Sequence, residues 1–291
     1  MSPPTFFETN EFTWVVQEIV NTYGIPSFGE ANPAVLTSIS FPFLFGVMFG
    51  DIGHGGLLFI VAGALVYFAD KLRHIEELEF LLSMRYLLLL MGFFATYMGL
   101  IYNDFMSIPL ELFGPGCYSY DKARDKNAYT KPDAKAQDCM YPFGFDPVWM
   151  NSESDITFYN SFKMKASVIM AIIHMSIGII LKGLNALHFN RKLDFYHEFI
   201  PQLILLLCLF GFMDVLIIQK WLTDWERVGD TSKAPSIINA MIGMFLKGGE
   251  SDPTREFEII GNQTFMMRFM VFLAMVTPPW MLCVKPLLLK R

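Results

Sequence analysis

The longest apolar stretch of the sequence, from Val35 to Phe68, constrains the fold more than any other feature. It holds about 34 residues, which as one α-helix would extend roughly 51 Å at about 1.5 Å per residue. The hydrocarbon core of a bilayer is only about 30 Å thick. Further apolar blocks follow at Tyr86–Tyr102, Ala166–Leu187, Phe199–Ile218 and Phe269–Leu289. This succession predicts an all-α fold, a polytopic transmembrane helical bundle.

Composition supports a membrane protein. Hydrophobic residues make up 53% of the 291 residues and charged residues only 17%, whereas soluble domains usually have about 25% charged residues. Too little polar surface remains to cover a water-soluble body of this size. The net charge of -6 and the lack of a dense Lys/Arg patch argue against nucleic-acid binding.

A glycine-rich motif, Gly50-Asp51-Ile52-Gly53-His54-Gly55-Gly56, interrupts the first block. Because one straight helix would overshoot the bilayer, we predict a break there, with spans at 36–51 and 55–69 forming a tight hairpin. The total is then six spans. The alternative is a single long helix that protrudes from the bilayer and kinks at the glycines.

Loop charge orients this topology, because short cytosolic loops carry an excess of Lys and Arg. Arg73, Arg191 and Lys285 lie on one side of a six-span chain, which we therefore predict to be cytosolic. Charge alone does not exclude a five-span topology. The expected segments are a cytosolic segment 1–34, the hairpin 35–69, a cytosolic loop 70–85, a span 86–104, a lumenal loop 105–163, a span 164–187, a cytosolic loop 188–198, a span 199–219, a lumenal loop 220–266 and a span 267–289.

The cysteines and one sequon fit the same topology. Cys117 and Cys139 share the first long loop, and an oxidising lumen would let them pair as a disulfide; two free, unrelated thiols are the alternative. Cys208 and Cys283 fall inside spans. Asn262 opens the sequon Asn-Gln-Thr and is a candidate glycosylation site, although its closeness to the next span favours an unmodified side chain.

Ionisable residues inside spans are rare and usually face a protein interior or a water-filled cavity. Five are candidates for lining a polar cavity or supporting a proton path: Asp51, His54, Asp104, Lys182 and Asp214. For Asp51 and His54 the alternative is a structural role that satisfies free backbone groups at the break. Lys182 is long enough to reach the interface. Asp214 is too short for that, which favours a cationic partner or an aqueous pocket.

Other motifs indicate structure rather than chemistry. Arg85 and Lys163 flank spans and are interpreted as interfacial anchors, and Gly46 to Gly50 resembles a small-xxx-small helix-packing motif. The sequence has no P-loop, G-x-S-x-G, H-E-x-x-H or C-x-x-C pattern. We therefore expect no catalytic residue, no cofactor and no bound metal.

Several longer segments carry a family resemblance. They are FPFLFGVMFGDIGHG at 41–55, RYLLLLMGFFATYMGLIYNDF at 85–105, YPFGFDPVW at 141–149 and FYNSFKMKASVIMAIIHM at 158–175. In order and spacing the chain resembles the membrane region of subunit a of the eukaryotic vacuolar-type proton ATPases. The likeness extends over nearly the whole chain.

The resemblance implies a static, non-catalytic part of a rotary machine, in which other chains hydrolyse ATP and turn a proteolipid ring. It implies as partners that c-ring, other Vo subunits, membrane lipid, transported protons and peripheral-stalk subunits, the last through an N-terminal domain absent here. The family motif with the essential arginine, S-H-T-A-S-Y-L-R-L-W, does not occur in this sequence. We therefore expect a central fragment whose six spans support the proton half-channels.

The family implies an integral membrane protein of a vacuole, endosome, lysosome or similar acidic organelle. Two other interpretations remain open. A stand-alone secondary transporter or channel would show paired repeats with broken helices, whereas only one break is seen. A purely structural assembly subunit would share the fold but line no aqueous route.

Overall fold

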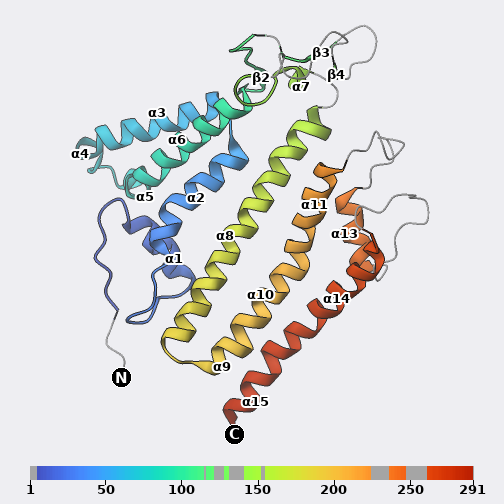
Figure 1. Ribbon diagram of the computed structural model, residues 1–291. Helices are drawn as coiled ribbons and strands as arrows, with labels where there is room; N and C mark the ends of the chain where they lie inside the picture. Colours follow the sequence, from blue (N-terminus) through green and yellow to red (C-terminus); the bar gives the residue numbers. More distant parts are fainter. Residues whose placement is uncertain are drawn as a thin grey trace. The chain divides into compact units, whose positions relative to one another are not determined.

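The computed structural model describes residues 5–114, 116–120, 128–130, 141–151, 155–223, 236–246 and 261–290. These residues are mostly helical (Figure 1). The chain divides into two compact units, Met1–Ser167 and Val168–Arg291.

The first unit is built around helix α6. The main helices are α1 (Trp14–Tyr23), α2 (Ala34–Phe49), α3 (Ile52–Tyr67) and α6 (Arg85–Tyr102), and the short elements between α3 and α6 are α4 (Ala69–Leu72), η1 (Glu76–Leu78) and α5 (Glu79–Ser83). Both α2 and α3 pack against α6. In Figure 1, α3 and α6 lie side by side along most of their lengths.

The first apolar block forms two helices rather than one, and the break lies inside the predicted motif. Gly50 and Asp51 are extended, and α3 begins at Ile52. The predicted turn over 50–56 is therefore too long, because Gly53, Gly55 and Gly56 lie within α3. In the expected hairpin α2 and α3 would pack mainly against each other. Each of them instead packs mainly against α6, so the hairpin is not confirmed.

Small residues bring these helices close together. A Cβ atom added at Gly46 of α2 would lie 2.7 Å from the carbonyl carbon of Phe94 in α6, and one added at Gly99 of α6 would lie 2.3 Å from the amide nitrogen of Ile52. Neither position has room for a side chain. The helix-packing role predicted for Gly46 is thus confirmed. Gly46 and Gly99 allow the helices to approach closely, as small residues do in membrane helices.

Two short ladders depart from the all-α prediction. Strands β1 (Asp104–Phe105) and β2 (Ile108–Pro109) pair antiparallel directly after α6, with Asp104 opposite Pro109. Strands β3 (Tyr118–Tyr120) and β4 (Ala128–Thr130) form the second ladder. The helical segments α7 (Val148–Asn151) and η2 (Asp155–Asn160) follow.

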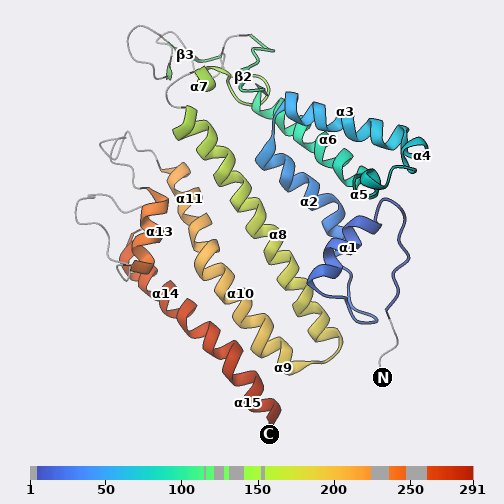
Figure 2. The ribbon, with the colours of Figure 1, turned by 180° about the vertical axis from the view of Figure 1, so that it is seen from behind.

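The second unit consists of long helices. Its elements are α8 (Ser161–His188, which begins in the first unit), α9 (Lys192–Asp194), η3 (Phe195–Phe199), α10 (Ile200–Leu206), η4 (Leu207–Gly211), α11 (Phe212–Leu222), α13 (Ile237–Leu246), α14 (Gln263–Pro279), η6 (Trp280–Val284) and α15 (Lys285–Lys290). Helices α10 and α14 lie side by side in both views (Figures 1 and 2). A core cluster from α11, α13 and α14 includes Leu216, Met244 and Met267.

Two of the π-helical segments have a common cause. Segment η3 ends two residues before Pro201, and η6 ends two residues before Pro286. Because proline has no N–H to donate to the preceding turn, the helix widens there instead of breaking. The two segments contact each other, and Trp280 Nε1 donates a hydrogen bond to His197 Nδ1 at 2.9 Å.

Four helices of the described chain are long and apolar enough to cross a membrane: Arg85–Tyr102, Phe158–His188, Lys192–Leu222 and Gln263–Lys290. The six-span count is not confirmed, because α2 and α3 have 16 residues each. That length corresponds to about 24 Å of helix, short of the roughly 30 Å hydrocarbon core.

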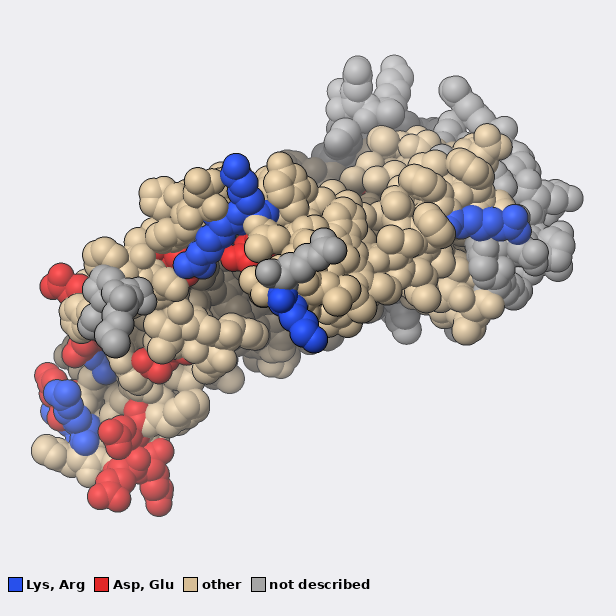
Figure 3. Space-filling model, turned by 90° about the horizontal axis from the view of Figure 1, so that it is seen from below, with Lys and Arg blue, Asp and Glu red and all other residues tan. Residues whose placement is uncertain are grey.

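Large apolar side chains are exposed on the long helices, as contact with lipid requires. Phe272 and Met275 of α14 are 64% and 70% exposed. On the face seen from below, uncharged side chains cover most of the surface and basic side chains form no continuous patch (Figure 3). Basic side chains scattered in this way offer little to a phosphate backbone.

Candidate functional site

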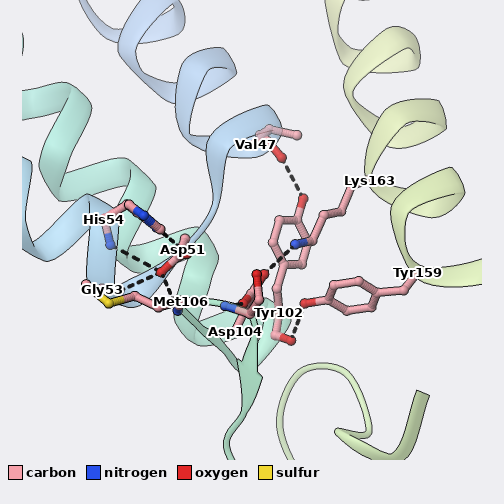
Figure 4. A network of polar contacts seen from close by, with 10 residues as sticks. Val47, Asp51, Gly53, His54, Tyr102, Asp104, Met106, Tyr159 and Lys163 are labelled. Carbon is pink, nitrogen blue, oxygen red and sulfur yellow. Dashed lines mark hydrogen bonds and ion pairs between the residues drawn. The ribbon is translucent and has the colours of Figure 1, made fainter. Parts of the chain in front are cut away.

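Asp51 organises the break between α2 and α3. Its Oδ1 accepts hydrogen bonds from the backbone N–H groups of Gly53 (2.6 Å), His54 (3.2 Å) and Met106 (3.1 Å). Its Oδ2 lies 2.7 Å from Nδ1 of His54 (Figure 4). The carboxylate thus caps the N-terminus of α3 and also holds the turn after α6.

The electrostatics of this pair follow from its contacts. Burial raises the pKa of the Asp51 carboxyl, but the hydrogen bonds from His54 and from the backbone N–H groups of Met106, His54 and Gly53 outweigh it, so the pKa lies below its ordinary value. The Asp51 side chain is 14% exposed, whereas that of His54 is 55% exposed. The Asp51 carboxylate is therefore held ionised beside the exposed side chain of His54.

Asp104 forms a second, more buried pair. Its Oδ2 lies 2.9 Å from Nζ of Lys163, and the two side chains are only 11% and 12% exposed. The Lys163 ammonium also lies 4.2 Å from the ring centroid of Tyr159 and 4.8 Å from that of Tyr102. These rings add cation–π attraction to the ion pair. Lys163 is thus an inward-facing partner, and the interfacial-anchor interpretation was wrong.

Tyrosine hydroxyl groups connect the pair to its neighbours (Figure 4). The Tyr159 hydroxyl donates to the backbone carbonyl of Tyr102 at 2.7 Å, and the Tyr102 hydroxyl donates to that of Val47 at 2.9 Å. Val47, Tyr102 and Tyr159 all belong to one buried cluster. The network therefore ties α2, the end of α6 and segment η2 together.

The turn between β1 and β2 joins the two carboxylates. Asp51 accepts from the N–H of Met106, and Asp104 Oδ1 accepts from the N–H of Ser107 at 3.0 Å. Met106 and Ser107 both have positive φ, 50° and 64°, so these hydrogen bonds hold a backbone that non-glycine residues seldom adopt. Three of the five predicted ionisable residues, Asp51, His54 and Asp104, thus share one site.

Lys182 belongs to another cluster, in the second unit. Its Nζ lies 2.9 Å from Glu198 and 3.2 Å from Oε1 of Gln202. Lys285 pairs with the same Glu198 and lies 2.9 Å from Asp194. Lys182 therefore takes part in an ion-pair cluster between α8, the α9–α10 region and the start of α15.

Asp214 is the most isolated of the candidates. It is 8% exposed in α11, next to the buried apolar residues of the second unit. Within the described residues, its Oδ1 is buried and has no hydrogen-bond partner. A buried carboxyl oxygen without a partner is costly, so this position needs an explanation beyond packing.

The remaining candidates lie in connecting segments. Cys117 is disulfide-bonded, and Cys208 and Cys283 are free. Cys139, the predicted partner, lies outside the described residues. Asn262 is exposed and immediately precedes α14, with φ of 59°.

Sequence reasoning missed Lys163 and the two tyrosines as site residues. Asp104 and Lys163 are separated by 59 positions, so no helical periodicity links them. The available signal was the opposite charge of two ionisable residues that each stand at the end of an apolar block.

Together, the long apolar helices and the buried polar network define a polytopic helical membrane protein. The chain belongs to the V-type ATPase 116 kDa subunit family, which matches residues 1–291.

Similar proteins cover the whole chain. It is 41% identical to V-type proton ATPase subunit a3 of Arabidopsis thaliana, over 100% of this chain and 34% of that protein. It is 42% identical to the vacuolar proton translocating ATPase 100 kDa subunit of Dictyostelium discoideum, over 100% and 35%. Identity to V-type proton ATPase 116 kDa subunit a1 of Xenopus laevis is 40%, over 100% and 36%. The chain thus spans about a third of the length of these relatives.

Proposed function

We propose that this chain is static membrane scaffolding of a rotary proton-translocating V-type ATPase, located in the membrane of an acidic organelle. The observation that carries the proposal is the family match over all 291 residues. In this role the chain hydrolyses no ATP. It stands beside a proteolipid ring, together with other Vo subunits, and supports the paths by which protons reach and leave that ring.

The network of Asp51, Asp104 and Lys163 supports a structural part of this role. A rotating ring exerts force on the static subunit beside it, so that subunit needs helices fixed to one another. A buried ion pair combined with buried tyrosine hydrogen bonds provides directional contacts that lipid cannot replace. The ends of α2 and α6 are therefore fixed by polar contacts rather than by apolar packing alone.

Asp214 supports a more direct role of this chain in the proton path. An intramembrane carboxyl oxygen that lacks a protein partner fits a group in contact with water or a proton. We propose that Asp214 lines an aqueous vestibule beside the proton path. A purely structural assembly subunit would instead keep this position dry.

Thiol accessibility tests the vestibule. In a chain with Cys208 and Cys283 replaced by serine, Asp214→Cys should react with a hydrophilic, membrane-impermeant maleimide. Leu216→Cys, two residues along the same helix and fully buried, is the matched control and should not react. Labelling of D214C only by a lipid-soluble maleimide would place Asp214 in a dry core. It would then favour the alternative, a purely structural assembly subunit.

Proton flux tests the stator role itself. Deprotonation of a passing carboxylate needs a fixed positive charge nearby, whereas Arg85 begins α6 and Arg268 lies near the start of α14. The chain alone in liposomes should therefore conduct no protons under an imposed potential. Selective proton flux through the purified chain would contradict the stator proposal and support a stand-alone channel.

A further inference from the structure

A small cavity opens beside the start of α6, within the first unit. Its volume is about 280 Å³, near the lower end of the range for small-molecule sites. Two segments far apart in the sequence form its walls, and its lining residues are Thr9, Asn10, Glu11, Trp14, Ser83 and Arg85.

The cavity presents a cation and an anion side by side. Arg85 Nη2 lies 2.5 Å from Oε2 of Glu11, and Arg85 Nη1 donates to the carbonyl of Leu82 at 3.0 Å. The Arg85 guanidinium also packs 4.8 Å from the ring centroid of Tyr86. Arg85 is only 17% exposed while Glu11 is 69% exposed, so the cation is fixed in place and the anion is accessible.

The position of the cavity along the span indicates which ligands reach it. Arg85 is the first residue of a helix long and apolar enough to cross a membrane. Trp14, which lines the cavity, is 46% exposed, and tryptophan is enriched at the level of lipid headgroups. Val16 and Leu87 belong to a buried cluster that holds α1 against this end of the unit, so the walls are preformed.

The two charges select among headgroups. A guanidinium binds phosphate oxygens well because its N–H groups match their geometry. Glu11 repels a headgroup with net negative charge, and its carboxylate accepts hydrogen bonds from a primary ammonium. A quaternary choline ammonium has no N–H to donate to it.

We propose that this cavity binds the headgroup of a zwitterionic glycerophospholipid with a primary ammonium, with the phosphate on Arg85 and the ammonium on Glu11. The acyl chains of such a lipid extend along α6 toward the bilayer centre. This site is separate from the network of Asp51 and Asp104 and does not depend on the proposed stator role.

Native mass spectrometry of the purified chain tests the proposal. The chain is exchanged into mixed micelles that contain equal amounts of phosphatidylethanolamine, phosphatidylcholine and phosphatidylglycerol, and the lipid retained per chain is counted. Phosphatidylethanolamine should be retained over the other two. Arg85→Gln should lower its retention about tenfold, as expected for loss of a charge-assisted hydrogen bond. Arg73→Gln, an exposed arginine on the preceding connection, is the matched control and should change nothing.

Glu11→Gln gives the decisive result, because an exposed side chain can be changed without loss of the fold. Removing its charge should reduce the preference for phosphatidylethanolamine and raise retention of anionic phosphatidylglycerol. Unchanged lipid ratios in E11Q would overturn the proposal, even if R85Q failed to fold. Soluble phosphoethanolamine should displace the lipid poorly, since it lacks acyl chains; displacement at lipid-like concentrations would overturn the lipid assignment and favour a free phosphorylated amine.

Discussion

Lys163 Nζ lies 2.9 Å from Asp104 Oδ2, although the two residues are 59 positions apart and stand at the ends of different helices. Asp104 lies two residues after the end of α6, and Lys163 lies in the first turn of α8. The contact fixes the end of one candidate span to the beginning of another.

Removing either partner of this pair should destabilise the chain. Lys163→Met or Asp104→Asn leaves one uncompensated buried charge or polar group, which typically costs about 3–5 kcal/mol of the free energy of unfolding. The double variant should lose less than the sum. Lys165→Met, on the same helix, is the matched control, since no ion pair of Lys165 occurs in the described residues. Denaturant unfolding in micelles measures these values, and strictly additive losses would contradict the pairing.

Asp51 should make stability depend on acid pH. Its folded-state pKa is lowered, so ionised Asp51 contributes stability above the unfolded value of about 3.9. That contribution is lost as the pH falls through the lower, folded-state value. Asp51→Ala should therefore cost about 0.5–2 kcal/mol near neutral pH, as for other helix caps, and the difference from wild type should shrink in acid.

The control for this pH profile is Asp70→Ala, which removes an exposed carboxylate from α4. Unfolding curves recorded across the acid range should show little difference between D70A and wild type. An Asp51 effect that stayed constant down to the lowest pH would argue against an ionised cap.

The close contact between Gly99 of α6 and the start of α3 should not tolerate an added methyl group. Gly99→Ala places a Cβ 2.3 Å from the Ile52 amide nitrogen, and overpacking of this kind typically costs about 1–3 kcal/mol. Gly56→Ala in α3 meets nothing within 4 Å. It should be neutral or stabilise by up to about 1 kcal/mol through helix propensity. Equal thermal stability of G99A and G56A would refute the close contact.

The bond of Cys117 should be lost when Cys139 is replaced. We predict that these two cysteines pair, so Cys139→Ser should leave Cys117 open to alkylation without reductant and lower stability by about 2–4 kcal/mol. Cys283→Ser removes an exposed free thiol and should have little effect. Peptide mapping under non-reducing conditions decides the pairing: separate Cys117 and Cys139 peptides would show that Cys117 has another partner.

The sequence predicted the long helices best, because a lipid bilayer restricts which backbone structures can cross it. Four apolar blocks became long helices because backbone groups in lipid must be satisfied within the helix. The break at Gly50 and Asp51 was also predictable, but its extent was not. Gly53 and Gly55 lie within α3, and at Gly55 an added Cβ would lie 2.6 Å from the amide nitrogen of Thr96 in α6. Composition cannot distinguish a glycine that allows close helix packing from one in a turn.

The candidate site was only partly predictable. The rarity of charged residues within predicted spans pointed to Asp51, His54 and Asp104, and these residues do share one site. Their partners were not predictable, because Lys163 and Tyr159 come from a distant segment placed only by tertiary packing. Asp214 was recognisable as unusual from its short side chain in an apolar helix, whereas nothing in the sequence indicated whether a partner faces it.

The paired π-helical segments η3 and η6 have a consequence for how the second unit meets its neighbours. Each π turn adds about one residue to an α-helix, and one residue corresponds to about 100° of rotation at 3.6 residues per turn. The stripe of side chains that each helix presents is therefore offset on either side of its segment. Because η3 and η6 touch, the two offsets occur at the same height along the packed helices. The two stripes of side chains therefore still face each other beyond that height. A one-residue deletion in only one segment would put the two helices out of phase, so length changes at these two places are coupled.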